Sequence, residues 1–423
     1  MSSGDEVPRL LRGLTSDGRP LSLTEHLALH GPVPAARARR DPDRNLVAEI
    51  ERSGLRGRGG AAFPVALKLA AVGARRGRRV VVVNGCEGEP VSSKDRVLLN
   101  QSPHLVLDGA TVAARAVGAA QIVVATKLDS AAVVEHAVAE RVRARLDEPT
   151  PRVVVVPDRY VAGQESALVN FLNSGRSAPT LVPPRPFERG VGGQPTLIQN
   201  AETVANLALI AGNGAEWFRR LGPAADPGTV LVTLTGAVER AGLYEVARGT
   251  SISVLLQRAG GPSAPVQAFL VGGYAGSWLT AAAGREACLD EASMAARGAV
   301  VAVGAVTVLP DTACGVAETA RILRYLAEES AGQCGPCVHG LASIAGSADE
   351  LARGIAERDV VTRLERWAGQ IAGRGACHHP DGAVRMLASA LRCFSDDVAA
   401  HRSGRPCPAA PPAGSRHRRG VLR

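Results

Sequence analysis

The stretch Arg78–Pro90, RRVVVVNGCEGEP, is the most informative about the fold. Its four consecutive valines predict a strand that is buried on both faces, as in a parallel sheet covered by helices. Polar residues follow where the strand ends: Asn84, then Glu87 and Glu89. Open α/β sheets bind ligands outside the carboxyl ends of their strands. The stretch therefore predicts an α/β fold with a binding site at this edge.

Similar patterns continue on both sides of this strand. AQIVVAT (120–126) and PRVVVVP (151–157) predict two further strands, and SAAVVEHAVAERVRARL (130–146) predicts the helix between them. Strands that alternate with helices are typical of a doubly wound parallel sheet. NLVAEIERSGLRGRGG (45–60) predicts a short helix that ends at Gly54 and leads into a glycine loop.

The chain divides into five predicted regions. After the α/β domain, an alternating strand, a turn, a second strand and a helix suggest a small α+β module, and the remainder has helical periodicity. The expected boundaries are an N-terminal arm with little sign of a core at 1–45, the α/β domain at 46–224, the small module at 228–300, a helical bundle at 315–400 and a disordered basic tail at 401–423.

Composition excludes several classes of protein. The net charge of +9 suggests a polyanion partner, but the last 23 residues hold six arginines and no acid, so the body is nearly neutral. An aromatic content of 3% argues against base stacking, and no nucleic-acid function is indicated. The start does not resemble a signal peptide, and no apolar run is long enough to span a membrane. We expect a cytoplasmic protein, with peripheral docking on a partner left open.

The glycine loop GLRGRGGAAFPVALK (54–68) has the features of a phosphate site. Gly57, Gly59 and Gly60 let backbone amides approach a ligand, and the helix that follows offers its free N–H groups. Arg58 and Lys68 add positive charge. The loop is neither a Walker loop nor a regular dinucleotide fingerprint, so alone it is weak support for a phosphate site.

Three other loops carry polar residues at strand or helix ends. NGCEGEPVSSKDR contains Asn84, Glu87, Glu89 and Lys94; YVAGQESALVNFL contains Gly163, Gln164 and Glu165; GQPTLIQNAETVAN contains Gln199, Asn200, Glu202 and Thr203. Each loop by itself is equally well explained by helix caps and turns. Four such loops together favour a single ligand site.

These segments together resemble the flavin- and NADH-binding subunit of respiratory complex I, a family that includes the diaphorase subunits of NAD-linked formate dehydrogenases and hydrogenases. The resemblance covers roughly residues 46–400 and rests on SGLRGRGGAAFP, NGCEGEP…KDR, AGQESAL, PPRPFERGVGGQPTLIQNAET, GLYEVARGT and CGPC. It implies an FMN-binding α/β domain, a ubiquitin-like β-grasp (soluble-ligand-binding) module and a helical bundle that holds an iron–sulfur cluster. This chain looks like a divergent member.

The resemblance also implies roles for individual residues. NADH would pass a hydride to FMN, which would release single electrons to the cluster. The residues implied to hold FMN are Gly57, Arg58, Gly59, Gly60, Lys68, Asn84, Glu87, Asn200 and Thr203. Phe63 would stack on the adenine, Gly163 would bind the cofactor, and Glu89, Gln164 and Glu165 would line the nicotinamide side, with Glu89 and Glu165 as the catalytic pair.

Several positions depart from the family pattern. Cys86 stands where an aspartate is usual, Ala62 replaces a loop glycine, and Gln164 replaces one of a pair of glutamates. Ala71 and Arg185 occupy two places where phenylalanines stack on the adenine, and each lost face weakens dinucleotide binding by about 1 kcal/mol. Arg185 offers a planar guanidinium instead, which would also accept the extra phosphate of NADPH.

The cysteine motif lacks one ligand. The family pattern is Cys-x2-Cys-x2-Cys with a fourth cysteine about forty residues later; here Ala331 takes the first place, before Cys334, Cys337 and Cys377. A [4Fe-4S] cluster normally has four thiolate ligands. The open outcomes are a three-iron cluster, a cube with an outside ligand, a Cys3His zinc site or buried thiols without a metal. The candidate fourth ligands are His339, His378, His379 and Cys393, whereas Cys288, Cys314 and Cys407 match no family ligand.

Three functions follow from the sequence as alternatives. The first is a flavoprotein oxidoreductase that takes electrons from NAD(P)H and passes them to a ferredoxin-like or other iron–sulfur partner. The second is an electron-transfer flavoprotein without nicotinamide chemistry, which Ala71 and Arg185 favour. The third is a non-catalytic scaffold built on the β-grasp module, against which Glu89 and Glu165 argue.

Overall fold

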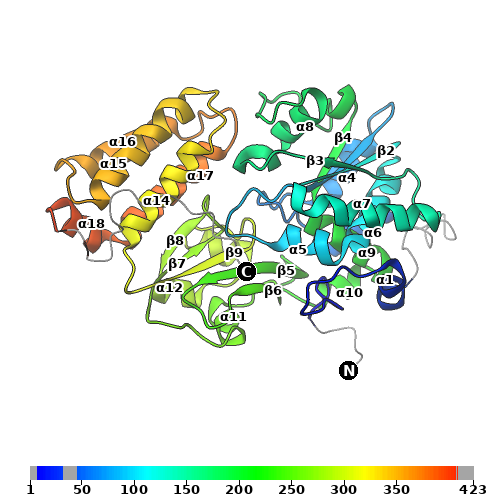
Figure 1. Cartoon of the computed structure of the whole chain (residues 1–423), viewed down its shortest axis with the longest axis horizontal. Coiled ribbons are helices and arrows are strands. Elements are labelled where there is room, and N and C mark those ends of the chain that lie inside the picture. Colours follow the sequence, from blue (N-terminus) through cyan, green and yellow to red (C-terminus); the bar gives the residue numbers. More distant parts are fainter. Residues whose placement is uncertain (1–6, 32–44, 406, 408–423) are drawn as a thin grey trace.

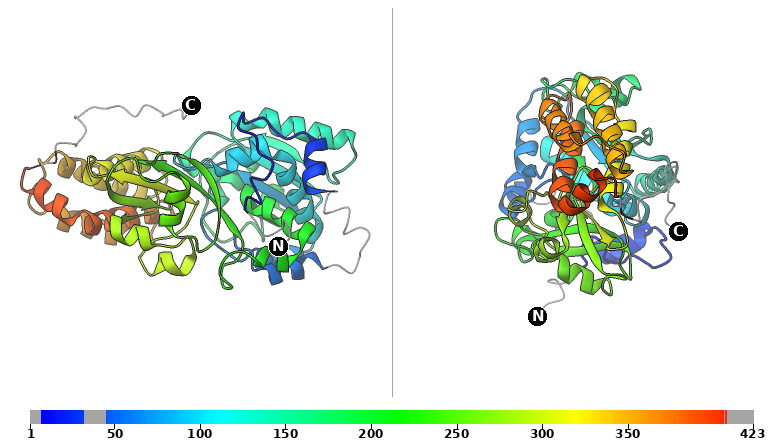
Figure 2. Two further views of the ribbon diagram at one scale, coloured as in Figure 1. Left: turned by 90° about the horizontal axis from the view of Figure 1, so that it is seen from below. Right: turned by 90° about the vertical axis from the view of Figure 1, so that its left-hand side faces the viewer.

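The computed structural model describes residues 7–31, 45–405 and 407. Figure 1 shows three parts: an α/β domain on the right, a helical bundle at the upper left, and a second sheet with its own helices below the bundle. The left view of Figure 2 shows that the molecule is elongated, with the second sheet next to both the helical bundle and the α/β domain. The expected class of fold, with an α/β domain, a β-grasp module and a helical bundle, is confirmed.

The first sheet has the strand order β3-β2-β1-β4 and is entirely parallel. Its strands are β1 (Val80–Gly85), β2 (Gln121–Thr126), β3 (Arg152–Val155) and β4 (Thr196–Asn200). Alternate valines of β1 point to opposite faces, so Val81 and Val83 join one core and Val80 and Val82 join another. Burial on both faces explains the uninterrupted apolar run.

Helices cover both faces of this sheet (Figure 1). They are α3 (Leu46–Ser53), α4 (Val65–Gly73), α5 (Lys94–Gln101), α6 (Pro103–Val117), α7 (Leu128–Arg143), α8 (Glu165–Ser174), α9 (Ala201–Asn213) and α10 (Ala215–Arg219), with 3-10 turns at Tyr160–Gly163 and Val191–Gly193. Helix α3 ends as the sequence predicts, because Gly54 adopts the left-handed conformation at φ 69°.

The N-terminal segment packs more tightly than an arm without a core would. Leu10 is fully buried in the core of the α/β domain, and the backbone amides of Leu10 and Leu11 donate to Glu245 Oε2. Helix α1 (Leu23–His30) places His26 Nε2 2.9 Å from Asp108 Oδ2. The short apolar stretches at 10–30 lack a clear period, which is why the sequence did not show this packing.

The second sheet has the order β6-β5-β9-β7-β8 and is mixed, with β5 parallel to β9 and the other pairs antiparallel. Its elements are β5 (Thr229–Gly236), β6 (Gly242–Ala247), α11 (Ile252–Arg258), β7 (Val266–Val271), β8 (Ser277–Thr280), α12 (Ala281–Glu286), α13 (Glu291–Ala295) and β9 (Ala305–Pro310). The expected boundary at 300 is therefore too early, because β9 is the central strand of this sheet.

The C-terminal part is a helical bundle with a core of its own. It consists of α14 (Gly315–Glu328), a π-helical turn (Pro336–Leu341), α15 (Ala342–Ala352), α16 (Val360–Ile371), α17 (His379–Cys393) and α18 (Ser395–Arg402). The predicted disordered tail begins too early, because His401 is fully buried; residues 406 and 408–423 lie outside the described residues. Within the described residues, no helix has the length and apolarity needed to cross a membrane.

Candidate functional site

The four polar loops meet at the carboxyl edge of the first sheet. Asn84 and Asn200 are paired neighbours at the ends of β1 and β4. The Asn84 side chain donates to the carbonyl of Gly163 at 2.7 Å, which brings in the third loop. The Arg58 amide donates to Thr203 Oγ1 at 2.8 Å, which brings in the glycine loop. Segments up to 145 residues apart thus meet at one edge of the sheet, and their service as one ligand site stays a prediction.

The glycine loop is shaped to approach a ligand closely. Gly57 donates to the carbonyl of Phe63 at 2.9 Å and closes the loop, while Gly60 adopts φ +106°, which L side chains rarely reach. A Cβ on Gly59 would come within 3.2 Å of Asn200 Cβ. Among the described residues, no side chain caps the start of α4, so the helix presents amides and its positive dipole end to a phosphate.

Lys68 supplies the accessible positive charge of this loop. Its Nζ lies 3.2 Å from Glu165 Oε1, and both side chains are about one third exposed. The Arg58 guanidinium, in contrast, is buried, donates to the carbonyl of Pro227 and lies 4.0 Å from Asp226. The Arg58 side chain therefore anchors the loop to the segment before β5, and its backbone and the adjacent glycines are the parts available to a ligand.

A buried ionic network joins the start of α5 to the junction of β4 and α9. Lys94 Nζ lies 2.8 Å from both Asp95 Oδ1 and Asn200 Oδ1, and 3.2 Å from Glu202 Oε2. Burial alone lowers the pKa of Lys94, but the surrounding carboxylates raise it above its usual value, so the lysine is charged. The sequence pointed to Lys94 and Glu202 but missed Asp95, because nothing in its spacing indicates that it bonds to Asn200.

Three of the predicted cofactor-binding residues cap helices, and one of them is Asn200, which accepts the Glu202 amide at the start of α9. The other two are Glu87 and Gln164. Glu87 accepts the amides of Asp95 and Arg96 at the start of α5, and also the Ser92 hydroxyl at 2.6 Å. Gln164 accepts the Ala167 amide at the start of α8. Their polar groups are thus engaged in holding helix ends at the site, and a direct contact of any of them with a flavin stays a prediction.

Glu89 is a buried acid beside the site. Burial raises the pKa of Glu89 to about 7, although hydrogen bonds, among them one from the Tyr160 hydroxyl at 3.2 Å, act in the opposite direction. Gly273, in the turn after β7, closes over it: a Cβ there would lie 2.5 Å from the carboxyl group. A carboxyl group with this pKa can take up or release a proton near neutral pH.

Cys86, by contrast, is an unreactive thiol. It is fully buried, and burial raises the pKa of its thiol to about 12. Because the thiolate is the reactive form of cysteine, Cys86 stays a neutral packing residue where the family usually has an aspartate. The exchange removes a negative charge from this edge of the sheet.

The cysteine motif faces the same edge. The Tyr160 amide donates to Glu329 Oε2 at 3.0 Å, and the Tyr160 ring lies 5.3 Å from that of His379 and 6.0 Å from that of Tyr325. Glu329 precedes Cys334, and His379 follows Cys377. Tyr160 therefore joins the polar site to the cysteine loops. No pattern in the sequence indicates this role, since tyrosine has no motif of its own.

The three predicted cysteine ligands lie near one another. Burial first, and then Cys334, with a further contribution from Cys377, raise the pKa of the Cys337 thiol to about 12. Cys337 lies in a π-helical turn, a feature frequent at functional sites. The residues suit an iron–sulfur cluster with three thiolates. Each cysteine thiolate binds a different iron of such a cluster, so the cysteine sulfurs need not touch one another.

The proposed fourth ligands differ in their availability. The His378 side chain is 97% exposed and bonds to Asp381, so it points away from the cysteines. His379 Nε2 lies 2.7 Å from the Leu326 carbonyl, and His339 is exposed. The Nε2 of His379 is therefore already engaged, His378 and His339 lie at the surface, and the position of Ala331 stays without a thiolate.

Comparisons with known proteins agree with this arrangement. The family model for the Nuo51 FMN-binding domain matches residues 50–209, that for the NADH-ubiquinone oxidoreductase-F iron–sulfur binding region matches 317–401, and the SLBB domain matches 231–273. The second F-type subunit of NADH-quinone oxidoreductase from Rhizobium meliloti is 32% identical over 95% of this chain and 99% of its own length.

Two further relatives come from hydrogenases. NADP-reducing hydrogenase subunit HndC of Solidesulfovibrio fructosivorans is 28% identical over 92% of this chain and 82% of its own. A chain of the NAD+-reducing [NiFe]-hydrogenase in its air-oxidised state superimposes with a TM-score of 0.81 at 30% identity, over 92% of this chain and 68% of that one. The chain therefore belongs to the family of F-type NADH-quinone oxidoreductase subunits, with the FMN-binding and iron–sulfur-binding regions of that family.

Proposed function

We propose that this chain oxidises NAD(P)H at an FMN bound by the four loops and passes the electrons through the cysteine motif to a partner protein. The observation that carries the proposal is the contact of all four loops at the carboxyl edge of β1 and β4, beside the cysteine loops. When bound, FMN supplies the conversion of a two-electron hydride transfer into single-electron steps.

The residues of the chain would divide the work of binding. Gly59, Gly60 and the start of α4 would hold the phosphate, and Lys68 would neutralise it. Asn84, Asn200 and Thr203 would fix the flavin, because hydrogen bonds between the loops already hold them in place. This division follows from their positions around one edge of the sheet and from the resemblance described above.

Glu89 and Glu165 would act on the nicotinamide side. Glu89 can hold a proton on its carboxyl group at neutral pH and is sheltered from water by Tyr160 and Gly273. Glu165 lies at the surface beside Lys68, and this pair can orient a polar substrate at the entrance. Neither role requires the carboxylates to move far, because Glu89 lies on the loop before α5 and Glu165 is the first residue of α8.

The first test of the proposal is FMN binding. Protein purified anaerobically should be yellow and contain about one FMN per chain. Gly60→Ala should weaken FMN binding at least about tenfold, because the loop must leave φ +106° or bear strain there. Gly261→Ala is the matched control: its φ is +95°, nothing lies within 4 Å, and it is far from the site. An apoprotein that takes up no FMN at micromolar concentration would refute the proposal.

The nicotinamide substrate is tested by flavin bleaching. NADH and NADPH are each added anaerobically to the flavin-loaded protein, and the flavin absorbance is followed. Bleaching by either confirms the proposed oxidation and shows which form is preferred. A flavin that only a reduced ferredoxin can bleach would favour the second function, an electron-transfer flavoprotein. Ala71 and the exposed Arg185 favour that function, because neither provides the aromatic face for the adenine.

The electron acceptor is expected to be an iron–sulfur protein, ferredoxin-like or a subunit of a larger assembly. The relatives are named as subunits of an NADH-quinone oxidoreductase and of hydrogenases, which supports an acceptor of this class. A cytoplasmic location with peripheral docking stays a prediction of the sequence. Anaerobic reduction of a ferredoxin by the NADH-loaded protein tests the acceptor.

A further inference from the structure

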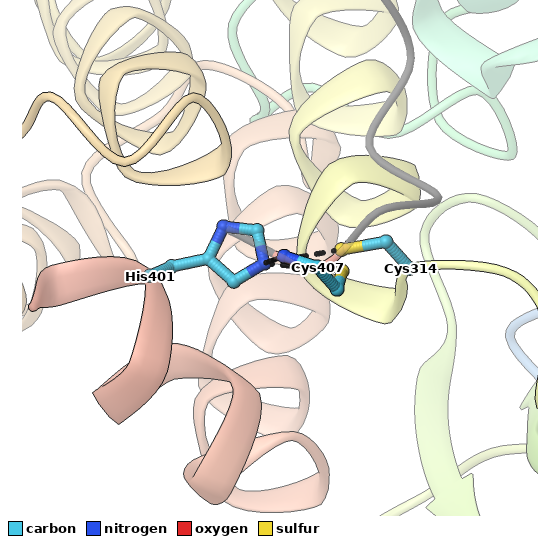
Figure 3. Close-up of side chains that lie close together, drawn as sticks. All are labelled: Cys314, His401 and Cys407. Atoms are coloured by element: carbon cyan, nitrogen blue, oxygen red, sulfur yellow. Dashed lines mark hydrogen bonds between the residues drawn. The ribbon is translucent and has the colours of Figure 1, made fainter. Parts of the chain in front are cut away.

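A second group of sulfur and nitrogen ligands lies in the helical bundle, away from the cysteine motif. In the described part of the chain, Cys314, His401 and Cys407 form the one group of three His, Cys, Asp or Glu residues whose ligand atoms all lie within 4.8 Å of one another. Figure 3 shows the imidazole of His401 pointing at both sulfurs. Cys314 precedes α14, His401 lies in the last turn of α18, and Cys407 follows it.

The two sulfurs converge on one nitrogen. Cys314 Sγ lies 3.4 Å from His401 Nε2, and Cys407 Sγ lies 3.2 Å from the same atom. Cys314 and His401 are buried, and Cys407 is half-buried. This convergence differs from a pair of thiols that happen to pack together, because three soft or borderline ligands point into one small space.

The other ring nitrogen of His401 determines what Nε2 can do. His401 Nδ1 lies 3.1 Å from the Leu351 carbonyl and 3.0 Å from the Ala352 carbonyl, at the end of α15. Carbonyl oxygens accept hydrogen bonds, so Nδ1 carries the proton and Nε2 has the lone pair. In this structure the lone pair accepts the backbone amide of Cys407 at 3.1 Å, and a metal ion at the site would take the place of that hydrogen bond. Histidines that bind metals are oriented in this way by a backbone carbonyl on the other nitrogen.

We propose that Cys314, His401 and Cys407 bind a single Zn²⁺ ion. Two thiolates and a neutral imidazole are ligands that zinc prefers, and tetrahedral coordination leaves a fourth position for water on the half-buried side of Cys407. Such close ligand atoms suit one ion rather than a cluster, in which the thiolates bind separate irons. The site is distinct from Cys334, Cys337 and Cys377.

The ion would cross-link three segments at the end of the helical bundle. It would join the start of α14 to the segment after α18, and through His401 to the end of α15. Binding replaces two thiol protons with the metal, and the imidazole of His401 binds through its unprotonated Nε2. Zinc binding should therefore release two protons per ion, which a pH-indicator titration measures.

Metal analysis of matched variants tests the proposal. Protein purified anaerobically with reductant should contain about one zinc per chain, and Co²⁺ in its place should give thiolate-to-metal absorption bands. Cys407→Ser and Cys314→Ser should each reduce the zinc content at least about tenfold and abolish the bands, with the iron content unchanged. Cys288→Ser, another half-buried cysteine without a partner cysteine nearby in the described structure, should change neither metal.

Three results would overturn the proposal: equal zinc content in Cys407→Ser and wild type, no zinc or cobalt bound by the wild-type chain, or a Cys314–Cys407 disulfide in the anaerobically prepared protein by mass spectrometry. Cys407 is half-buried and packs on the edge of the bundle core, and serine is close to cysteine in size; circular dichroism checks that the variant keeps its helices. The cobalt spectrum of the wild-type protein tests the site without any substitution.

Discussion

The helical bundle contains two groups of cysteines, one near the start of α14 and one after its end. The two groups differ in sequence pattern, in neighbours and in the compactness of the ligand set. Cys334, Cys337 and Cys377 belong to a motif recognisable by spacing, they adjoin the flavin edge through Tyr160, and they lack a fourth thiolate. Cys314 and Cys407 match no motif, yet with His401 they form a compact ligand set with an oriented imidazole. A sequence motif therefore identifies the ancestry of a site, whereas the geometry shows what it can bind now.

The largest expected effect is that substitutions in the two groups remove different metals. Cys337→Ser should reduce iron and acid-labile sulfide to less than about a tenth and leave zinc unchanged, because two thiolates cannot hold a cluster. Cys407→Ser should do the reverse. Inductively coupled plasma mass spectrometry of both variants measures the two metals in one experiment. Loss of both metals in either variant would show that the two groups are not separate sites.

The missing thiolate can be restored with Ala331→Cys. A fourth thiolate gives each iron of a cube its own ligand, so the iron content should rise from about three toward about four per chain and the signal of an oxidised three-iron cluster should disappear from low-temperature EPR. His339→Ala, an exposed histidine near the motif, is the control and should leave the spectrum unchanged. If Ala331→Cys changes neither iron nor EPR, the open corner lies elsewhere.

Glu89, at the flavin edge, should make the free energy of unfolding depend on pH. Its folded pKa of about 7 exceeds its ordinary value of 4.5, so the folded protein holds the proton more tightly than the unfolded chain. The stability from this group is full below pH 4.5 and is lost as pH rises through 7, by about 3 kcal/mol.

Glu89→Gln should remove this pH dependence, as measured by chemical denaturation of the apoprotein between pH 4.5 and 8. Glu165→Gln, at the exposed Lys68 pair, is the matched control and should change the profile little. A slope that persists in Glu89→Gln would show that another group titrates in this range.

The smallest effect is expected from Tyr160→Phe. The Tyr160 hydroxyl lowers the pKa of Glu89, so its removal should raise that pKa. The pH dependence of flavin reduction should shift upward with it, whereas the zinc content should not change. Tyr244→Phe, whose hydroxyl bonds to Arg240 in the second sheet, is the control. A downward shift would contradict the assignment of the hydrogen bond.

Much of the fold could be predicted from local patterns. The valine run of β1 required burial on both faces, and Gly54 required a helix end, because these properties depend only on the residues concerned. The convergence of the polar loops followed from the parallel strands, whose carboxyl ends share one edge. The N-terminal packing and the pairing of β9 with β5 in the second sheet escaped prediction, since both depend on partners far away in the chain.

By itself the sequence determined the order of the domains, the loops that meet at the flavin edge and the loss of one cysteine ligand at Ala331. Only the tertiary structure decided that Arg58 turns into the core, that Tyr160 contacts both the polar site and the cysteine loops, and that Cys314, His401 and Cys407 meet. The physical reason is distance along the chain: spacing rules describe residues on one element, whereas these contacts form between elements brought together by packing.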